Sequence, residues 1–156
     1  MVEFALLLPV LLLLVANVVN FGAFCYAWIT LTDAARSGAE YMMLAGASVN
    51  GPSAPTGTQV RTLVTNDVVA LPNRASLQVS VCTNNNTIVT CSGTPTFTPV
   101  VDPENGTAPG KYVLASVRVT YTYQPLIPLA DFPGLGIHVT LPPTTLHREA
   151  QVRMLQ

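Results

Sequence analysis

Apolar residues run almost unbroken through the N-terminal part of this chain. No charged residue stands between Glu3 and Asp33, an interval longer than the roughly 20 apolar residues that span a bilayer. The next stretch keeps a helical spacing but becomes polar on one side, where Asp33, Arg36 and Glu40 recur at three- and four-residue steps. The pattern predicts one helix over residues 1–46, about twice as long as the hydrocarbon core of a membrane is thick.

Several residues inside this predicted helix are unusual for a simple membrane anchor. A proline lacks the amide hydrogen of the helix ladder, so a kink is expected near Pro9. Amide side chains in an apolar run need partners on neighbouring helices or on their own backbone, and small residues let helices approach closely. The candidates for contacts between helices are Pro9, Asn17, Asn20, Gly22, Ala23 and Ala27.

A Gly-, Pro- and Ser-rich stretch at residues 47–56 interrupts the helical pattern and predicts a linker. After it, apolar side chains recur at helical spacing before Pro72, at Val60, Leu63, Val64, Val68 and Leu71. This spacing predicts a second, shorter helix, with Ser53, Thr56 or Thr58 available as its N-cap. The Val and Thr content of the same stretch leaves a strand as the alternative.

From about residue 75 the apolar pattern changes to alternation, which is typical of β-strands. Segments 75–82 and 87–91 predict a hairpin, and further strands are expected at 111–123, 135–141 and 144–155. In the last strand the expected inward residues are Leu146, Ala150, Val152 and Met154, and the expected outward residues are His147, Glu149, Gln151 and Arg153. The pattern predicts a small antiparallel sheet with one solvated face.

These elements together predict an α+β fold, with a long N-terminal apolar α-helix followed by a small domain that combines a short helix and an antiparallel β-sheet. The expected organisation is the helix at residues 1–46, the linker at 47–56 and the globular domain at 57–156. The composition, 49% hydrophobic and 10% charged, indicates more apolar surface than a small core hides. With a net charge of −1 and scattered cations, no basic stripe exists to bind nucleic acid.

Two cysteines flank the turn of the predicted hairpin. The separation of Cys82 and Cys91 suits a disulfide across paired strands, which would indicate an oxidising compartment; two buried thiols are the alternative. Cys25, in the apolar run, is expected to be a lone buried thiol. His138 and His147 have no metal-ligand spacing to these cysteines, and no catalytic or phosphate-binding motif occurs, so we expect neither a metal, a cofactor nor an enzyme.

The opening MVEFALLLP, followed by the apolar run and then LTDAARSGAEYMM, resembles the N-terminal region of TadE-like pilins. The resemblance implies a protein similar to type IV pilins, which are made with a short basic leader, cut by a prepilin peptidase in the inner membrane and drawn into a filament. No Lys or Arg precedes the apolar run, which agrees with removal of such a leader. The resemblance also implies that Glu3 meets the α-amine of Met1 on a neighbouring subunit.

A simpler role for Glu3 is that its carboxylate lies among lipid headgroups and favours the positive end of its own helix, which is worth under about 1 kcal/mol. The leading functional hypothesis is a structural subunit of an extracellular filament, reached through the inner membrane, whose partners are other copies of itself and the pilus assembly machinery. The contacts between subunits would then involve Met1, Glu3 and the small and amide residues of the helix. The alternatives are a membrane-anchored minor pilin and a ligand-binding surface or periplasmic domain.

Overall fold

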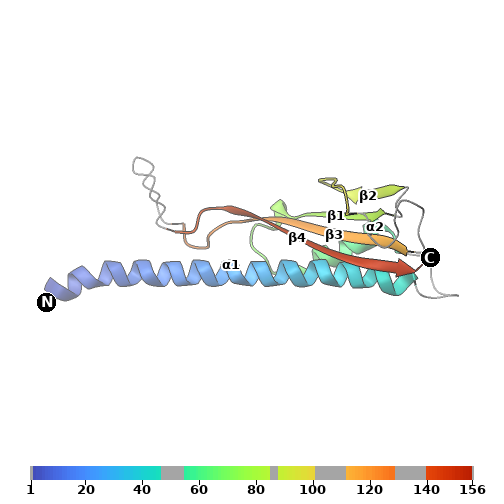
Figure 1. Cartoon of the computed structure of the whole chain (residues 1–156). Helices are drawn as coiled ribbons and strands as arrows, with labels where there is room; N and C mark the ends of the chain where they lie inside the picture. Colours follow the sequence, from blue (N-terminus) through green and yellow to red (C-terminus); the bar gives the residue numbers. More distant parts are fainter. Residues whose placement is uncertain (1, 47–54, 85–87, 101–111, 129–139, 156) are drawn as a thin grey trace.

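The computed structural model describes residues 2–46, 55–84, 88–100, 112–128 and 140–155. Its elements are α1 (Val2–Gly46), α2 (Gly57–Asp67), the short 3-10 helix η1 (Arg74–Ser76), β1 (Gln78–Asn84), β2 (Val89–Gly93), β3 (Tyr112–Tyr123) and β4 (Thr144–Leu155). Figure 1 shows a long helix whose C-terminal half lies along a small sheet, while its N-terminal part extends beyond the sheet. The predicted α+β class, with a long apolar helix before a small helix-and-sheet region, is confirmed.

α1 is a single helix of 45 residues that continues through Pro9. In its C-terminal half, small and apolar residues spaced by three or four positions form a buried stripe: Ala27, Leu31, Ala34, Ala35, Ala39 and Met42. The alanines let the helix axis lie close to the sheet. Gly38 is the tightest point, because a methyl group there would lie 2.7 Å from a side-chain carbon of Val64 on α2.

α2 begins at a capping box. The backbone amide of Gln59 donates to the hydroxyl of Thr56 at 3.4 Å, and the side-chain carbonyl of Gln59 accepts from the amide of Thr56 at 2.9 Å. The helical prediction for this stretch is confirmed, with Thr56 as the cap. The helix ends at Asp67, and the chain continues in a turn that still buries Val68 and Leu71.

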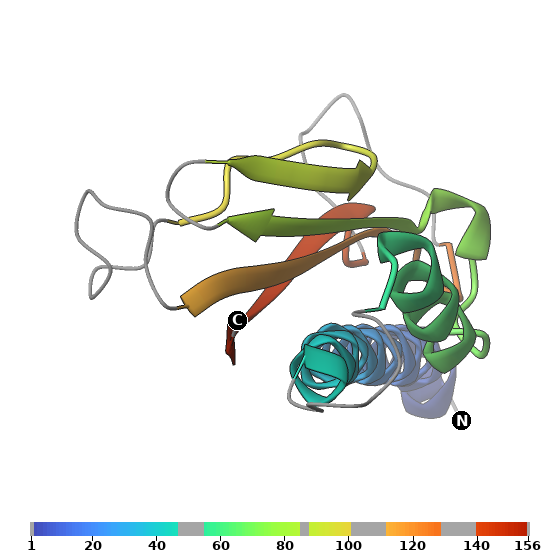
Figure 2. The ribbon, with the colours of Figure 1, turned by 90° about the vertical axis from the view of Figure 1, so that its right-hand side faces the viewer.

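The four strands form one antiparallel sheet in the order β2-β1-β3-β4. Figure 2 shows both helices on the same side of this sheet. The face toward the helices carries most of the core, from Val79 and Val81 of β1 and Ala115, Val117, Val119, Tyr121 and Tyr123 of β3. The predicted hairpin and the predicted strands at 111–123 and 144–155 are confirmed, while most of the expected strand at 135–141 lies outside the described residues.

The side chains on the opposite face of the sheet are more buried than the alternating pattern predicted. Ser80, Cys82, Asn84, Ser116 and Thr120 point away from the helices, yet all are buried. The chain that leaves β2 returns across these residues and buries two bulky side chains there, Phe97 and Pro99. The expectation of one fully solvated face is therefore wrong for the β1–β3 part of the sheet, because this return segment has no periodicity that would reveal its position.

Candidate assembly surface

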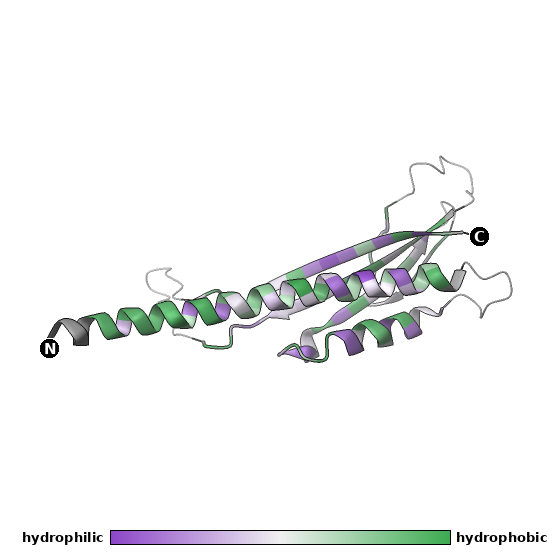
Figure 3. Cartoon of the chain, turned by 90° about the horizontal axis from the view of Figure 1, so that it is seen from below, coloured by the Kyte–Doolittle hydropathy of each residue, from purple (hydrophilic) through white to green (hydrophobic). Residues whose placement is uncertain are grey.

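The N-terminal part of α1 presents an apolar surface that the rest of the described chain leaves uncovered. We call residues 7–19 the apolar stem. Its large side chains are exposed around most of the helix, for example 62% for Leu7 and 59% for Leu14, and include Leu8, Val10, Leu11, Leu12, Leu13, Val15, Val18 and Val19. Figure 3 shows the hydrophobic stem projecting beyond the sheet, with hydrophilic residues interspersed farther along the helix. The segment Leu7–Leu44 is long and apolar enough to cross a membrane.

The candidate contact residues fall into different environments. Asn17 donates its side-chain amide to the carbonyl of Leu13 at 3.0 Å, a bond to its own helix backbone that was one of the two expected kinds of partner. Gly22 is open, since a methyl group at this position would meet nothing within 4 Å among the described residues. Ala23 packs at the margin of the core, and Ala27 is only 1% exposed, so its small side chain serves contact within the chain.

The structure does not describe the side chains of Met1 and Glu3, the two residues expected to form the charge pair. Met1 lies outside the described residues, and Glu3 lies in α1 while its side chain is outside the described part of the chain. Pro9 is inside the helix, on the apolar stem. The roles of Met1, Glu3, Pro9, Asn17 and the small residues between subunits therefore stay predictions.

Asn20 marks the point where the stem meets the domain. Its side-chain amide donates to the carbonyl of Ile127 at 2.9 Å, and its side-chain oxygen accepts from the amide of Ile127 at the same distance. The hydroxyl of Tyr123 donates to the backbone carbonyl of Asn20 at 2.7 Å. Asn20 is fully buried by these contacts, which satisfy an amide that lipid would leave unpaired. The expectation that this amide bonds to a neighbouring helix or to its own helix backbone is therefore wrong for Asn20, because the chain around Ile127 supplies both partners.

Aromatic side chains follow Asn20 along α1. Phe24 packs edge-on against Tyr123, with ring centroids 5.5 Å apart, and lies 6.0 Å from the ring of Trp28. The guanidinium of Arg148, on β4, lies 3.2 Å from the centre of the Trp28 ring. This cation–π contact joins the edge strand β4 to α1, on the C-terminal side of the apolar stem. Aromatic and basic residues at this level are typical of the boundary between a membrane and water.

Arg148 was missing from the predicted inward face of the last strand. It lies between Leu146 and Ala150 in the alternation, and the register pairs it with Val119 on the core side of β3. Its Nη1 donates to the carbonyl of His147 at 3.3 Å, while Nε and Nη2 are buried and make no hydrogen bond to the described residues. The stacking on the indole ring compensates part of this desolvation.

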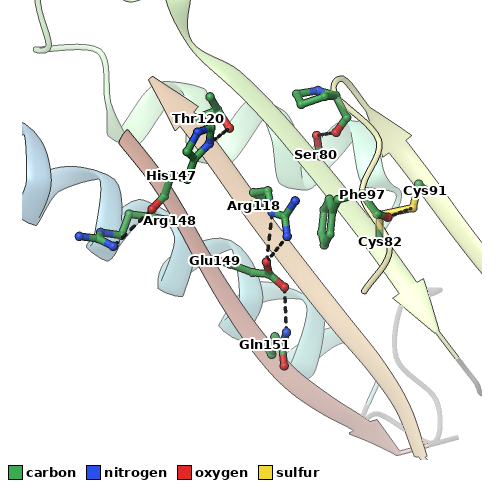
Figure 4. Close-up of polar contacts among 11 residues, drawn as sticks. Ser80, Cys82, Cys91, Phe97, Arg118, Thr120, His147, Arg148, Glu149 and Gln151 are labelled. Carbon is green, nitrogen blue, oxygen red and sulfur yellow. Dashed lines mark hydrogen bonds and ion pairs between the residues drawn. A yellow bond between two sulfur atoms is a disulfide. The ribbon is translucent and has the colours of Figure 1, made fainter. Parts of the chain in front are cut away.

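Polar contacts occupy the outer face of β3 and β4 (Figure 4). Arg118 Nη2 lies 2.6 Å from Glu149, and its guanidinium also covers the ring of Phe97 at 3.9 Å. The hydroxyl of Thr120 and Nδ1 of His147 are 3.0 Å apart. These groups partner one another, and among the described residues no cluster of three or more His, Cys, Asp or Glu side chains is placed to hold a metal ion.

The hairpin disulfide is present. Cys82 and Cys91 are directly paired across β1 and β2 and are joined by a bond between their sulfur atoms. The prediction from their spacing is confirmed, and the bridge ties the edge strand β2 to the centre of the sheet. Cys25 is a free thiol, as expected, but it is half-buried on α1 and not fully buried as predicted.

Two charged residues on the exposed face of the C-terminal half of α1 pair with each other. Arg36 Nε lies 3.2 Å from a carboxylate oxygen of Glu40, and both side chains are largely exposed. An exposed pair of this spacing contributes only about 0.3–0.5 kcal/mol. This face is therefore a solvated surface in the single chain, in contrast to the apolar stem.

The family model of TadE-like proteins matches residues 1–40 of the chain. The match covers 40 of 156 residues and includes the apolar stem, Asn20, Trp28 and the start of the polar half of α1. No curated protein and no solved structure matches the chain. The resemblance to TadE-like proteins noted in the sequence is confirmed for this N-terminal region.

Proposed function

We propose that this chain is a structural subunit of an extracellular filament similar to a type IV pilus. On this proposal α1 first holds the chain in the inner membrane, a prepilin peptidase processes it, and the pilus assembly machinery draws it into a helical polymer of identical subunits. Residues 1–46 then form the filament core, and residues 57–156, joined through 47–56, form the outer wall. The match of residues 1–40 to TadE-like proteins supports this function.

The observation that carries the proposal is the exposure of the apolar stem. Ten large aliphatic side chains between Leu7 and Val19 are exposed in the single chain. Burial of a Val or Leu side chain is worth about 1.5–3 kcal/mol, so leaving this stem in water costs on the order of 10 kcal/mol. A bilayer removes the cost before assembly, and neighbouring copies of the same stem remove it afterwards.

Lipid tails and neighbouring helices differ in the contacts that they can make with the apolar stem. Lipid tails are as apolar as leucine, so helices associate in a membrane through close packing and hydrogen bonds rather than through the hydrophobic effect. The open surface at Gly22 allows another helix to come close. A second copy of α1 is the partner whose small residues and length match this surface.

In this proposal Glu3 sets the alignment of neighbouring subunits. A carboxylate in a low-dielectric environment costs several kcal/mol unless it is paired or protonated. The α-amine of Met1 on the adjoining subunit is the opposite charge that the pilin resemblance implies. Because the pair forms only when subunits are correctly aligned, its main effect is on specificity of assembly.

The proposal is tested by replacing Glu3 with Ala and examining the cell surface for filaments by electron microscopy. We expect the Glu3→Ala chain to accumulate in the membrane, with its disulfide formed and its sheet folded, and to give no filaments. Glu40→Ala is the matched control, because Glu40 is an exposed carboxylate on the same helix with only a weak surface pair. Abundant normal filaments from Glu3→Ala would contradict the role of the carboxylate.

A further inference from the structure

A polar cavity lies on the side of the domain formed by α2, η1 and the start of β1. Its volume is about 490 Å³, within the roughly 300–1,000 Å³ of typical small-molecule pockets. Arg61 and Arg74 both line it, together with side chains able to bind hydroxyl groups, among them Thr62, Thr65, Asn66 and Gln78. None of these residues belongs to the apolar stem, so the cavity is independent of the surface proposed for assembly.

No described residue compensates the charges of this cavity. The described residues that line it include no Asp or Glu, and neither Arg61 nor Arg74 forms an ion pair with another described residue. Nε of Arg61 is buried and has no hydrogen-bond partner among the described residues. In contrast, Arg36 and Arg118 are paired with carboxylates. Arg61 and Arg74, which form no ion pair among the described residues, thus share one cavity, where low-dielectric walls strengthen their combined field.

The neutral side chains complete the chemistry of the cavity. The hydroxyls of Thr62 and Thr65 donate to carbonyls of their own helix, at 3.0 and 2.7 Å, and so present free lone pairs as acceptors. Asn66 and Gln78 offer both donors and acceptors. Because the described residues that line the cavity include no aromatic side chain, they do not favour the stacking of a base or of an aromatic ligand.

We infer that this cavity binds a small oxyanion carried on a hydroxylated ligand, namely the carboxylate or the phosphate of a sugar. Arginine is suited to this recognition because its planar fork of N–H donors matches two oxygens of a carboxylate or phosphate. Arg61 and Arg74 hold the oxyanion, and the threonine, asparagine and glutamine side chains bind ligand hydroxyls. The site gives the globular domain, residues 57–156, an affinity for acidic sugars that is separate from polymer formation.

The arginine Nε–H groups report directly on binding. The full chain, labelled with nitrogen-15 in detergent micelles, is titrated at constant ionic strength with phosphate, with glucuronate and with neutral glucose. We expect phosphate, glucuronate or both to shift the Nε–H resonances of Arg61 and Arg74 in a saturable way, while those of Arg36 and Arg118 stay fixed and glucose has no effect. A response to phosphate alone identifies a phosphorylated sugar as the ligand class, and a response to glucuronate alone identifies a carboxylated one.

Substitution separates a specific site from general attraction of anions. Arg61→Gln and Arg74→Gln should each weaken binding at least about tenfold, since a charge-assisted hydrogen bond is lost. Arg36→Gln, an exposed arginine on another face, should leave the affinity unchanged. Equal shifts at Arg36, full retention of binding in Arg61→Gln, or no response to either anion would overturn the inference. None of these outcomes depends on filament formation.

Discussion

Replacing Asn20 with Leu should release the segment around Ile127 from α1 while leaving the helix intact. Leucine has a similar size and a better helix propensity, so the change removes the amide without opening a cavity or breaking the helix. Two hydrogen bonds of 2.9 Å disappear, and the backbone amide and carbonyl of Ile127 lose their partner. The bond from the Tyr123 hydroxyl to the backbone of residue 20 can remain.

The expected size of this effect follows from the two lost bonds. Each partly buried group left unpaired costs about 1–3 kcal/mol, so the two groups together give a gross loss of about 2–6 kcal/mol. The extra apolar surface and the helix propensity of leucine return about 1–2 kcal/mol. With central values of about 4 and about 1.5 kcal/mol, the net loss of local stability is about 2.5 kcal/mol, which raises the equilibrium constant for local opening roughly 70-fold.

Hydrogen exchange at the amide of Ile127, measured on the full chain in micelles, is the assay. Asn20→Leu should raise the exchange rate of Ile127 by this factor and leave the amides in the middle of β3 protected. Asn17→Leu is the matched control, because it makes the same chemical change about one turn earlier, where the side-chain amide donates to the carbonyl of Leu13 on the same helix. Unchanged exchange in Asn20→Leu, or an equal increase in Asn17→Leu, would refute the reasoning.

Three further changes test the packing of the domain. Replacing Cys82 and Cys91 with Ser should lower the free energy of unfolding by about 2–3 kcal/mol, seen as a lower midpoint in denaturant, because the bridge closes a short loop; an unchanged midpoint would contradict its stabilising role. Gly38→Ala should destabilise the chain by up to about 2 kcal/mol in thermal melts, since a clash with a stiff valine of α2 outweighs a helix-propensity gain of about 1 kcal/mol; a higher melting temperature would contradict this balance. Burial raises the pKa of Tyr121 and Tyr123, so the unfolded chain ionises first and stability should fall as pH rises above about 10, the ordinary tyrosine value; a flat melting temperature between neutral and strongly alkaline pH would count against it.

The helices and strands were accessible to sequence reasoning because their signals are local. α1 shows an unbroken apolar run, and α2 shows a cap and a helical stripe whose Thr56–Gln59 box is formed by residues three positions apart. The hairpin combines alternation with two cysteines at a separation that matches its register. Each of these patterns lies within one continuous segment of the chain, so residues near in sequence carry the information.

The features that sequence reasoning missed depend on long-range contacts. The partner of Asn20 is 107 residues away, in a proline-rich segment that has no periodicity. Arg148 breaks the apolar alternation of its strand, and only the position of Trp28 explains why a cation faces the helix. The burial of the outer sheet face depends on the route of the chain around Phe97, which no local pattern reveals.

The candidate assembly surface was predictable in part. The length and apolar character of the stem were visible in the sequence, and so were the small residues beside it. Which of these small residues are available to a partner was not predictable, since the structure leaves Gly22 open and buries Ala27 inside the chain. Both are small residues on one helix, and only the position of the sheet separates the face available to a partner from the face already in use.

Electron microscopy of material sheared from the cell surface, with mass spectrometry of the same fraction, tests the central claim most directly. The account predicts regular filaments in which this chain is the main component, with its apolar stem protected from proteases by neighbouring subunits. Recovery of the chain only from the membrane fraction, as a monomer with no filament containing it, would contradict the proposal of a polymerising subunit.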